Sequence, residues 1–153
     1  MDLNRAEQLA ISLMKQHGIY ELGWRFEFDR AKRRFGVCRY RNKTIGLSKY
    51  LTAINDEARI KNTILHEIAH ALVGYKHGHD EVWRRKAIEI GCDGERCVNQ
   101  LEANVIKGKY QAVCKNGHVH YRHKATKEGR KSSCGICSKR FNPEFILEYK
   151  IVH

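Results

Sequence analysis

The chain has 153 residues, and its 29 Lys and Arg exceed its 17 Asp and Glu to give a formal net charge of +12. This length suits one domain with at most a small appendage, and no apolar run of about 18 residues predicts a transmembrane helix. The N-terminal residues also lack the apolar core of a signal peptide, so we expect a cytoplasmic protein with reduced cysteines and no membrane contact.

The first predicted element is an amphipathic helix over residues 3–17, where apolar residues recur at helical spacing. Asn4 and Glu7 are placed to form a capping box at its start, and Gly18 can end it. Three short strands are then predicted at residues 24–28, 35–40 and 44–47. Gly36 in the second strand permits a close approach by another element. We interpret the three strands as an antiparallel meander.

The next predicted helix begins near Asn55 or Asp56 and contains the sequence His66-Glu67-Ile68-Ala69-His70. Two His residues four positions apart lie one above the other on the same helix face, so both imidazoles can bind one zinc ion. Glu67, beside the first His, can accept a proton from a water bound to that zinc. A stripe of apolar residues indicates a packed helix rather than a solvated one: Ile60, Ile64, Ile68, Ala71 and Leu72.

A catalytic zinc usually has three protein ligands, so the third is expected downstream, after Gly74 ends the helix. His77 and His79 are both candidates, and we favour His79. It precedes a predicted helix at about residues 80–90, which Asp80 can cap. The packed face of this helix is expected to hold Val82, Trp83, Ala87 and Ile90. A ligand at the start of a helix is held more firmly than one in the middle of a turn.

Cysteine spacing predicts a second metal site in the C-terminal third. A predicted strand at 110–114 leads into a turn, and 15 residues separate His118 from the C-x2-C turn that begins at Cys134. This separation is usual for the two halves of a zinc ribbon. We therefore predict a structural zinc site at Cys114, His118, Cys134 and Cys137, with His120 and His123 as alternatives for the fourth ligand. The pair Cys92 and Cys97 has no matching pair nearby, and we interpret both as ordinary loop cysteines.

Positive charge is concentrated in the same region. Residues 104–153 hold 11 Lys or Arg and 3 Asp or Glu, which accounts for +8 of the total +12. Between the two halves of the ribbon, Tyr121 lies among basic residues that we predict to contact nucleic acid: Arg122, Lys124, Lys127, Arg130 and Lys131. Basic side chains interleaved with an aromatic suit phosphate contact and base stacking, so DNA is the expected partner.

The first group of metal ligands resembles that of the SprT-like, or Spartan-like, zinc metallopeptidases. The H-E-x-x-H motif is followed after eight residues by His79, which has Gly78 before it and an aromatic residue, Trp83, four positions later. Family members commonly have Gly directly after the third His, where this chain has Asp80, but the departure leaves all three ligands in place. The C-terminal ribbon also resembles the SprT pattern, so the resemblance covers most of the chain.

This resemblance implies a zincin-like α+β fold, with a minimal gluzincin-type core at residues 1–103 and a basic zinc ribbon at 104–153. A small antiparallel sheet is expected beside the metal-binding helix. In zincins generally, the edge strand of this sheet can pair with an extended peptide substrate. We expect the third strand, 44–47, to be that edge.

The resemblance further implies a DNA-dependent protease that acts on proteins bound or crosslinked to DNA. We expect a zinc metalloendopeptidase with two zinc ions, in which His66, His70 and His79 hold the catalytic zinc. Glu67 would move the proton while the activated water attacks the peptide carbonyl. We expect a monomer that associates with DNA or the nucleoid. The alternative is a non-catalytic, zinc-containing DNA-binding module, which a closed site with four protein ligands would indicate.

Overall fold

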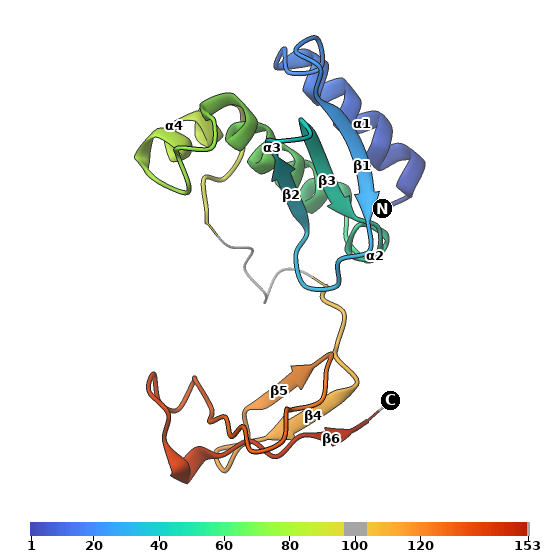
Figure 1. Cartoon of the computed structure of the whole chain (residues 1–153). Helices are drawn as coiled ribbons and strands as arrows, with labels where there is room; N and C mark the ends of the chain where they lie inside the picture. Colours follow the sequence, from blue (N-terminus) through green and yellow to red (C-terminus); the bar gives the residue numbers. More distant parts are fainter. Residues whose placement is uncertain (97–103, 153) are drawn as a thin grey trace. The chain divides into compact units, whose positions relative to one another are not determined.

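The computed structural model describes residues 1–96 and 104–152 of the chain (Figure 1). The chain divides into two compact units, Met1–Ile106 and Lys107–His153. The predicted boundary at residue 103 lies outside the described residues and stays a prediction, and the interpretation of Cys97 lies outside them too. Among the helices that are described, none combines the length and the apolar character needed to cross a membrane.

The first unit begins with helix α1, Leu3–Gln16, which agrees closely with the predicted span. Its N-cap is Asp2, whose side chain accepts a hydrogen bond from the Arg5 backbone N–H, so the predicted capping box at Asn4 is wrong. Asp2 is the N-cap because the capping residue precedes the helix and has an extended backbone, whereas Asn4 already lies within the first turn. The buried face of α1 carries Ala6, Ala10, Leu13 and Met14.

Three strands form the sheet of this unit: β1 at Arg25–Asp29, β2 at Gly36–Arg39 and β3 at Thr44–Ser48. Their order is β1-β3-β2, with β1 parallel to β3 and β2 antiparallel to it. The predicted antiparallel meander is therefore wrong for β1, and the prediction that residues 44–47 form the edge is wrong as well. Every residue of β3 is buried, and a central position gives such a strand backbone partners on both sides.

Each of the three helices that follow is preceded by a Ser or Asp whose side chain caps its N-terminus. Helix α2, Lys49–Ile54, was not predicted and is capped by Ser48. Helix α3, Glu57–Val73, is capped by Asp56 and ends at Gly74, which has a φ of 86°. Helix α4, Glu81–Glu89, is capped by Asp80.

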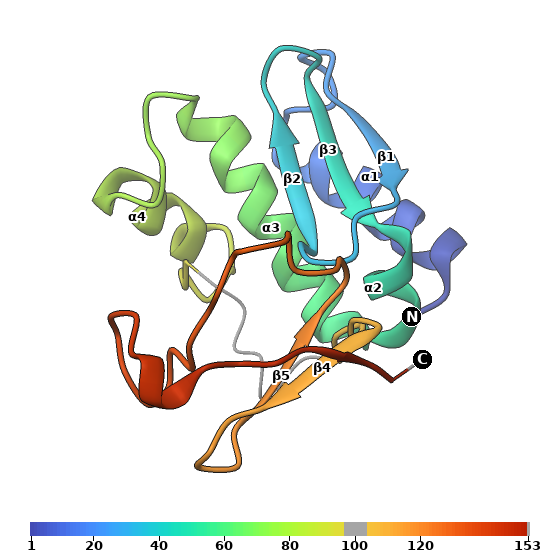
Figure 2. The same ribbon diagram turned by 60° about the horizontal axis from the view of Figure 1, so that its bottom comes forward.

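Helix α3 packs against α1, β2 and β3, and it runs along the sheet in both views (Figures 1 and 2). The predicted stripe is buried at Ile60, Ile64 and Ile68, whereas Leu72 is 37% exposed. On α4, Trp83 and Ala87 are buried as predicted, but Val82 is 48% exposed. The sequence period places a residue on one side of a helix, but the width of the covered face depends on the neighbouring elements.

The second unit contains a small sheet of three strands, β4 at Tyr110–Val113, β5 at Val119–Arg122 and β6 at Lys150–Ile151, in the order β5-β4-β6. A short 3-10 helix, Pro143–Phe145, precedes β6. The core of the second unit consists of Ala112, Cys114, Cys134 and Leu147, so two of its four buried apolar residues are cysteines. A core this small needs further support, which a metal can supply. The α+β class predicted from the sequence is confirmed, with a Cys/His cluster in the C-terminal unit that is consistent with a zinc ribbon.

Candidate metal centres and active site

Three imidazoles converge in the first unit. His66 and His70 stand one turn apart on α3, and His79 lies just before Asp80, the N-cap of α4. The Nε2 atom of His79 is 3.0 Å from Nε2 of His66 and 3.1 Å from Nε2 of His70. Ligand nitrogens around a tetrahedral zinc lie roughly 3.3–3.4 Å apart, given Zn–N bonds of about 2.0–2.1 Å. The three side chains therefore form a donor set of the right type and spacing for zinc.

The backbone orients two of these rings. Glu95 hydrogen-bonds the His66 ring through its backbone, and His77 does the same for the His70 ring. Since the Nε2 atoms face His79, these bonds engage the other ring nitrogen and select the tautomer with a free Nε2 lone pair. Burial, and then the neighbouring His charges, lower the pKa of both rings to about 4. Both are thus neutral near pH 7, which is the form that binds a metal.

The ring of Trp83 packs against all three imidazoles. Its ring centroid is 4.6 Å from that of His66, 5.2 Å from that of His70 and 4.6 Å from that of His79. The side chain is 1% exposed, so it shields one side of the three candidate ligands from solvent. This is the aromatic residue that the sequence places four positions after His79.

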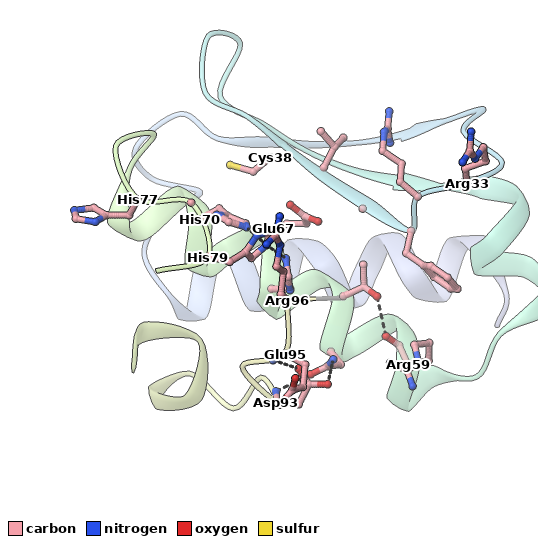
Figure 3. A pocket seen from close by; sticks show the side chains of 18 of the residues that line it. Arg33, Cys38, Arg59, Glu67, His70, His77, His79, Asp93, Glu95 and Arg96 are labelled. Carbon is pink, nitrogen blue, oxygen red and sulfur yellow. Dashed lines mark hydrogen bonds between the residues drawn. The ribbon is translucent and has the colours of Figure 1, made fainter. Parts of the chain in front are cut away.

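His77 does not join the group. Its Nδ1 atom lies 2.8 Å from Oδ2 of Asp80, and in the close view it points away from His70 and His79 (Figure 3). His77 instead contributes its backbone, through the hydrogen bond to the His70 ring. Among the described residues, the candidate ligands that come together are His66, His70 and His79.

Glu67 is 8% exposed and lies between α3 and the sheet. Burial raises the pKa of its carboxyl to about 8, although the Arg34 charge and a hydrogen bond from the Cys38 backbone act in the opposite direction. Gly36 makes this position possible, because a Cβ atom there would lie 2.7 Å from Oε1 of Glu67 and 2.9 Å from Cγ2 of Thr63. A buried carboxyl with a raised pKa beside metal ligands has the properties of a general base.

These groups line a cavity of about 630 Å³ that is bounded on one side by β2 (Figure 3). The Phe35 carbonyl accepts a hydrogen bond from the Ser48 N–H, so alternate residues of β2 pair with β3. The backbone groups of Gly36 and Cys38 are consequently directed to the outer edge, where the Cys38 N–H bonds Glu67. The sheet edge beside the candidate ligands is β2, in place of the strand at 44–47 that the sequence suggested.

The second cluster lies in the C-terminal unit. The metal-binding atoms of Cys114, His118, Cys134 and Cys137 all lie within 4.8 Å of one another. Nδ1 of His118 is 3.3 Å from Sγ of Cys137, 3.5 Å from that of Cys114 and 3.6 Å from that of Cys134. A set of three thiols and one imidazole supplies all four ligands of a tetrahedral site, which is typical of structural zinc.

His120 approaches the same cluster from outside. Its Nε2 atom is 3.2 Å from Sγ of Cys134, and Asn116 donates from Nδ2 to Sγ of Cys137 at 3.4 Å. Both contacts are hydrogen bonds to candidate ligands, of the kind that orients metal-bound sulfur. His123 is not a member of the cluster that the described residues form.

The predicted nucleic-acid contacts lie on β5 and in the segment after it. Arg122 is half-buried, with its guanidinium 4.4 Å from the ring centroid of Tyr149 and a bond to Thr126. The other predicted contacts are exposed: Lys124, Lys127, Arg130 and Lys131. Arg122 thus has a packing role that its charge did not suggest.

Sequence reasoning missed several residues that support the first site. The Tyr40 hydroxyl donates to the His70 carbonyl at 3.2 Å. Asn62 and Asp93 bond each other reciprocally beside His66. No sequence signal could have found these contacts, because each joins residues 30 or 31 positions apart.

Comparison with protein-family models matches residues 6–107 to the SprT-like family. The match includes most of α1, the whole β1-β3-β2 sheet and the three converging imidazoles. No curated protein matches the chain.

Proposed function

Because this chain belongs to the SprT-like family, we propose that it is a zinc metalloendopeptidase that cleaves proteins bound or crosslinked to DNA. Membership of this family indicates a metallopeptidase-like domain in general. The substrate and the mechanism are part of the proposal. The observation that carries it is the position of Glu67, which is buried beside three imidazoles whose Nε2 atoms converge. A merely structural zinc site has no need for a buried carboxyl at this position.

The residues of the first unit suit peptide hydrolysis. A zinc ion held by His66, His70 and His79 would polarise the scissile carbonyl and lower the pKa of a water. Glu67 lines the same cavity as the three imidazoles, and the positive charge of a bound zinc would favour its ionised form, which is suited to accept a proton from the attacking water and to pass it to the leaving amine. Burial between α3 and β2 keeps this carboxyl away from bulk solvent while it holds the proton.

The outer edge of β2 is suited to hold the substrate backbone. Gly36, at the start of the strand, lies beside Glu67, whereas Tyr40, just after its end, bonds the His70 carbonyl. A peptide that pairs antiparallel with β2 would therefore run from the His70 end of the cavity toward the Glu67 end. Backbone pairing tolerates many side chains, which suits a protease that must act on diverse proteins.

DNA binding is proposed for the second unit on the basis of its charge. Its segment after β5 holds exposed Lys124, Lys127, Arg130 and Lys131, and no ion pair to any of them is seen within the described residues. Unpaired basic groups are available to neutralise phosphates. Such binding would bring the peptidase unit to proteins that are attached to DNA.

The substitution Glu67→Gln tests the enzymatic proposal. It keeps the shape and removes the base, so we expect two zinc ions per chain, an unchanged fold and no detectable cleavage of a DNA-bound protein. Unchanged cleavage would remove Glu67 from the mechanism. A wild-type chain that holds one zinc, retains it after His66→Ala/His70→Ala substitution and binds DNA without cleaving protein would instead be the non-catalytic module.

The DNA-dependent part needs its own assay. We expect the wild-type chain to cleave a protein crosslinked to an oligonucleotide faster than the same protein free in solution. Equal rates on the two substrates would contradict the DNA-directed activity and leave a general metallopeptidase.

A further inference from the structure

The segment after α4 returns to α3 and lies against His66. Asn62 lies four residues, about one helical turn, before His66, so the two side chains share one face of α3. Asp93 lies in the returning segment, and it lines the same cavity as Asn62 and His66. The close view places Asp93 and Glu95 together beneath the site (Figure 3).

Asn62 and Asp93 form a two-way connection. Nδ2 of Asn62 donates to Oδ2 of Asp93 at 2.8 Å, and the Asp93 backbone N–H donates to Oδ1 of Asn62 at 2.9 Å. This pairing fixes both the side chain and the backbone of residue 93 relative to the helix. The contact joins residues 31 positions apart, and it fixes the point along α3 at which the segment after α4 lies.

The other carboxylate oxygen of Asp93 shapes the turn that follows. Oδ1 accepts a hydrogen bond from the Glu95 backbone N–H at 2.9 Å. Gly94 between them has a φ of 71°, a left-handed conformation that glycine adopts without strain. The turn directs the Glu95 backbone to the His66 ring, to which it is hydrogen-bonded.

We propose that Asn62 and Asp93 are positioning residues for the metal ligand His66. They hold the Glu95 carbonyl against the His66 ring and thereby keep Nε2 directed at the site shared with His70 and His79. The inference rests on the proposed zinc site, and it adds two residues that do not touch the metal. His70 needs no such pair, because its supporting backbone at His77 lies in the turn that directly follows α3.

Zinc affinity of the full chain, measured by competition with a chelator, tests this role. Asn62→Ala should weaken zinc at the His66 site by about 10-fold or more, the usual effect of removing a group that orients a metal ligand. Zinc at the Cys114 cluster should be unchanged, which makes it an internal reference. The His66→Ala/His70→Ala variant identifies which phase of the competition belongs to which site.

A charge-swapped pair separates positioning from simple loss of packing. Asn62→Asp alone puts two carboxylates face to face and should weaken zinc as Asn62→Ala does. Adding Asp93→Asn restores a donor opposite an acceptor in all three hydrogen bonds. The double variant should therefore recover zinc affinity to within about threefold of wild type.

Asn55→Ala is the matched control. Asn55 is also joined to a distant residue by two hydrogen bonds: its Nδ2 donates to the Asn104 carbonyl at 2.8 Å, and the Asn104 N–H donates to its Oδ1 at 2.9 Å. Both residues belong to the first unit, and neither lines the cavity that contains His66. Asn55→Ala should lower the thermal midpoint without weakening zinc at the His66 site. An unchanged affinity in Asn62→Ala, an equal loss in Asn55→Ala, or no recovery in the double variant would overturn the proposal. A wild-type chain with zinc only at the Cys114 cluster would instead overturn the proposed function on which it rests.

Discussion

Gly36 of β2 and Glu67 of α3 are in direct contact, so close that a Cβ atom at residue 36 would lie 2.7 Å from Oε1 and 2.8 Å from Cγ of Glu67. Real Cβ atoms do not approach other atoms this closely, so any side chain at residue 36 must displace the carboxyl or the strand. The edge strand β2 and the carboxyl of Glu67, the candidate base, therefore meet at residue 36. The absence of a side chain at Gly36 is what allows both to face the same cavity.

Gly36→Ala is expected to reduce kcat for peptide cleavage by about 100-fold, because a displacement of about 1 Å in a reacting group has effects of that size. Zinc content should stay at the wild-type level, since the three atoms nearest to a Cβ at residue 36 belong to Glu67 and Thr63, neither of which is a candidate ligand. Gly78→Ala is the matched control: Gly78 lines the same cavity, but a Cβ there meets nothing within 4 Å. Equal losses in the two variants would contradict the specific contact with Glu67.

Glu67→Gln should stabilise the metal-free protein increasingly as the pH rises. The carboxyl titrates at its ordinary value of 4.5 when unfolded and at about 8 when buried. Between these values the folded state keeps a proton that the unfolded state releases, so folding is disfavoured as pH rises. The gain at pH 8 should be on the order of a few kcal/mol, and it should vanish near pH 4. Chemical denaturation of both proteins with chelator present, across this range, measures it; a pH-independent difference would refute it.

His79→Ala should lose zinc from the first unit, whereas His77→Ala should keep it. The Nε2 atom of His79 lies 3.0–3.1 Å from those of the other two imidazoles, but the His77 side chain bonds Asp80. Elemental analysis of the purified variants, together with wild type, makes the comparison. Zinc loss in His77→Ala alone would reverse the assignment of the third ligand.

His118→Ala should remove zinc from the C-terminal unit, whereas His120→Ala should weaken its binding by about 10-fold. His118 reaches all three sulfurs, but His120 contacts only Cys134. His123→Ala serves as the neutral control in this series. Each affinity can be read by chelator competition, and a reversed order of His118 and His120 would exchange their roles.

Replacing Lys127 and Lys131 by Ala should reduce the salt dependence of DNA binding. Each lost phosphate contact lowers the slope of log affinity against log salt by about 0.7 on single strands and about 0.9 on duplex. The double variant should thus lower the slope by roughly 1.5. Lys15→Ala/Lys61→Ala, on exposed positions of α1 and α3, is the control of equal charge. The same change in both variants would indicate a general effect of net charge rather than a contact surface.

The sequence by itself predicted those features that depend on neighbouring residues. Helical spacing placed His66 and His70 on one face, and the side chains of Asp56 and Asp80 marked the starts of α3 and α4. Spacing also marked the residues of the Cys/His cluster, because a C-x2-C turn brings its two sulfurs together locally. All of these patterns are read within a few turns of chain, where geometry follows directly from residue separation.

Only the tertiary structure decided which distant segments meet. It placed β3 in the centre of the sheet and made β2 the edge beside the cavity, because complete burial of β3 requires backbone partners on both sides. It also brought Asn62 to Asp93 and Gly36 to Glu67. Such contacts join residues some 30 positions apart and depend on how all the elements pack together, so no local period or spacing in the sequence encodes them.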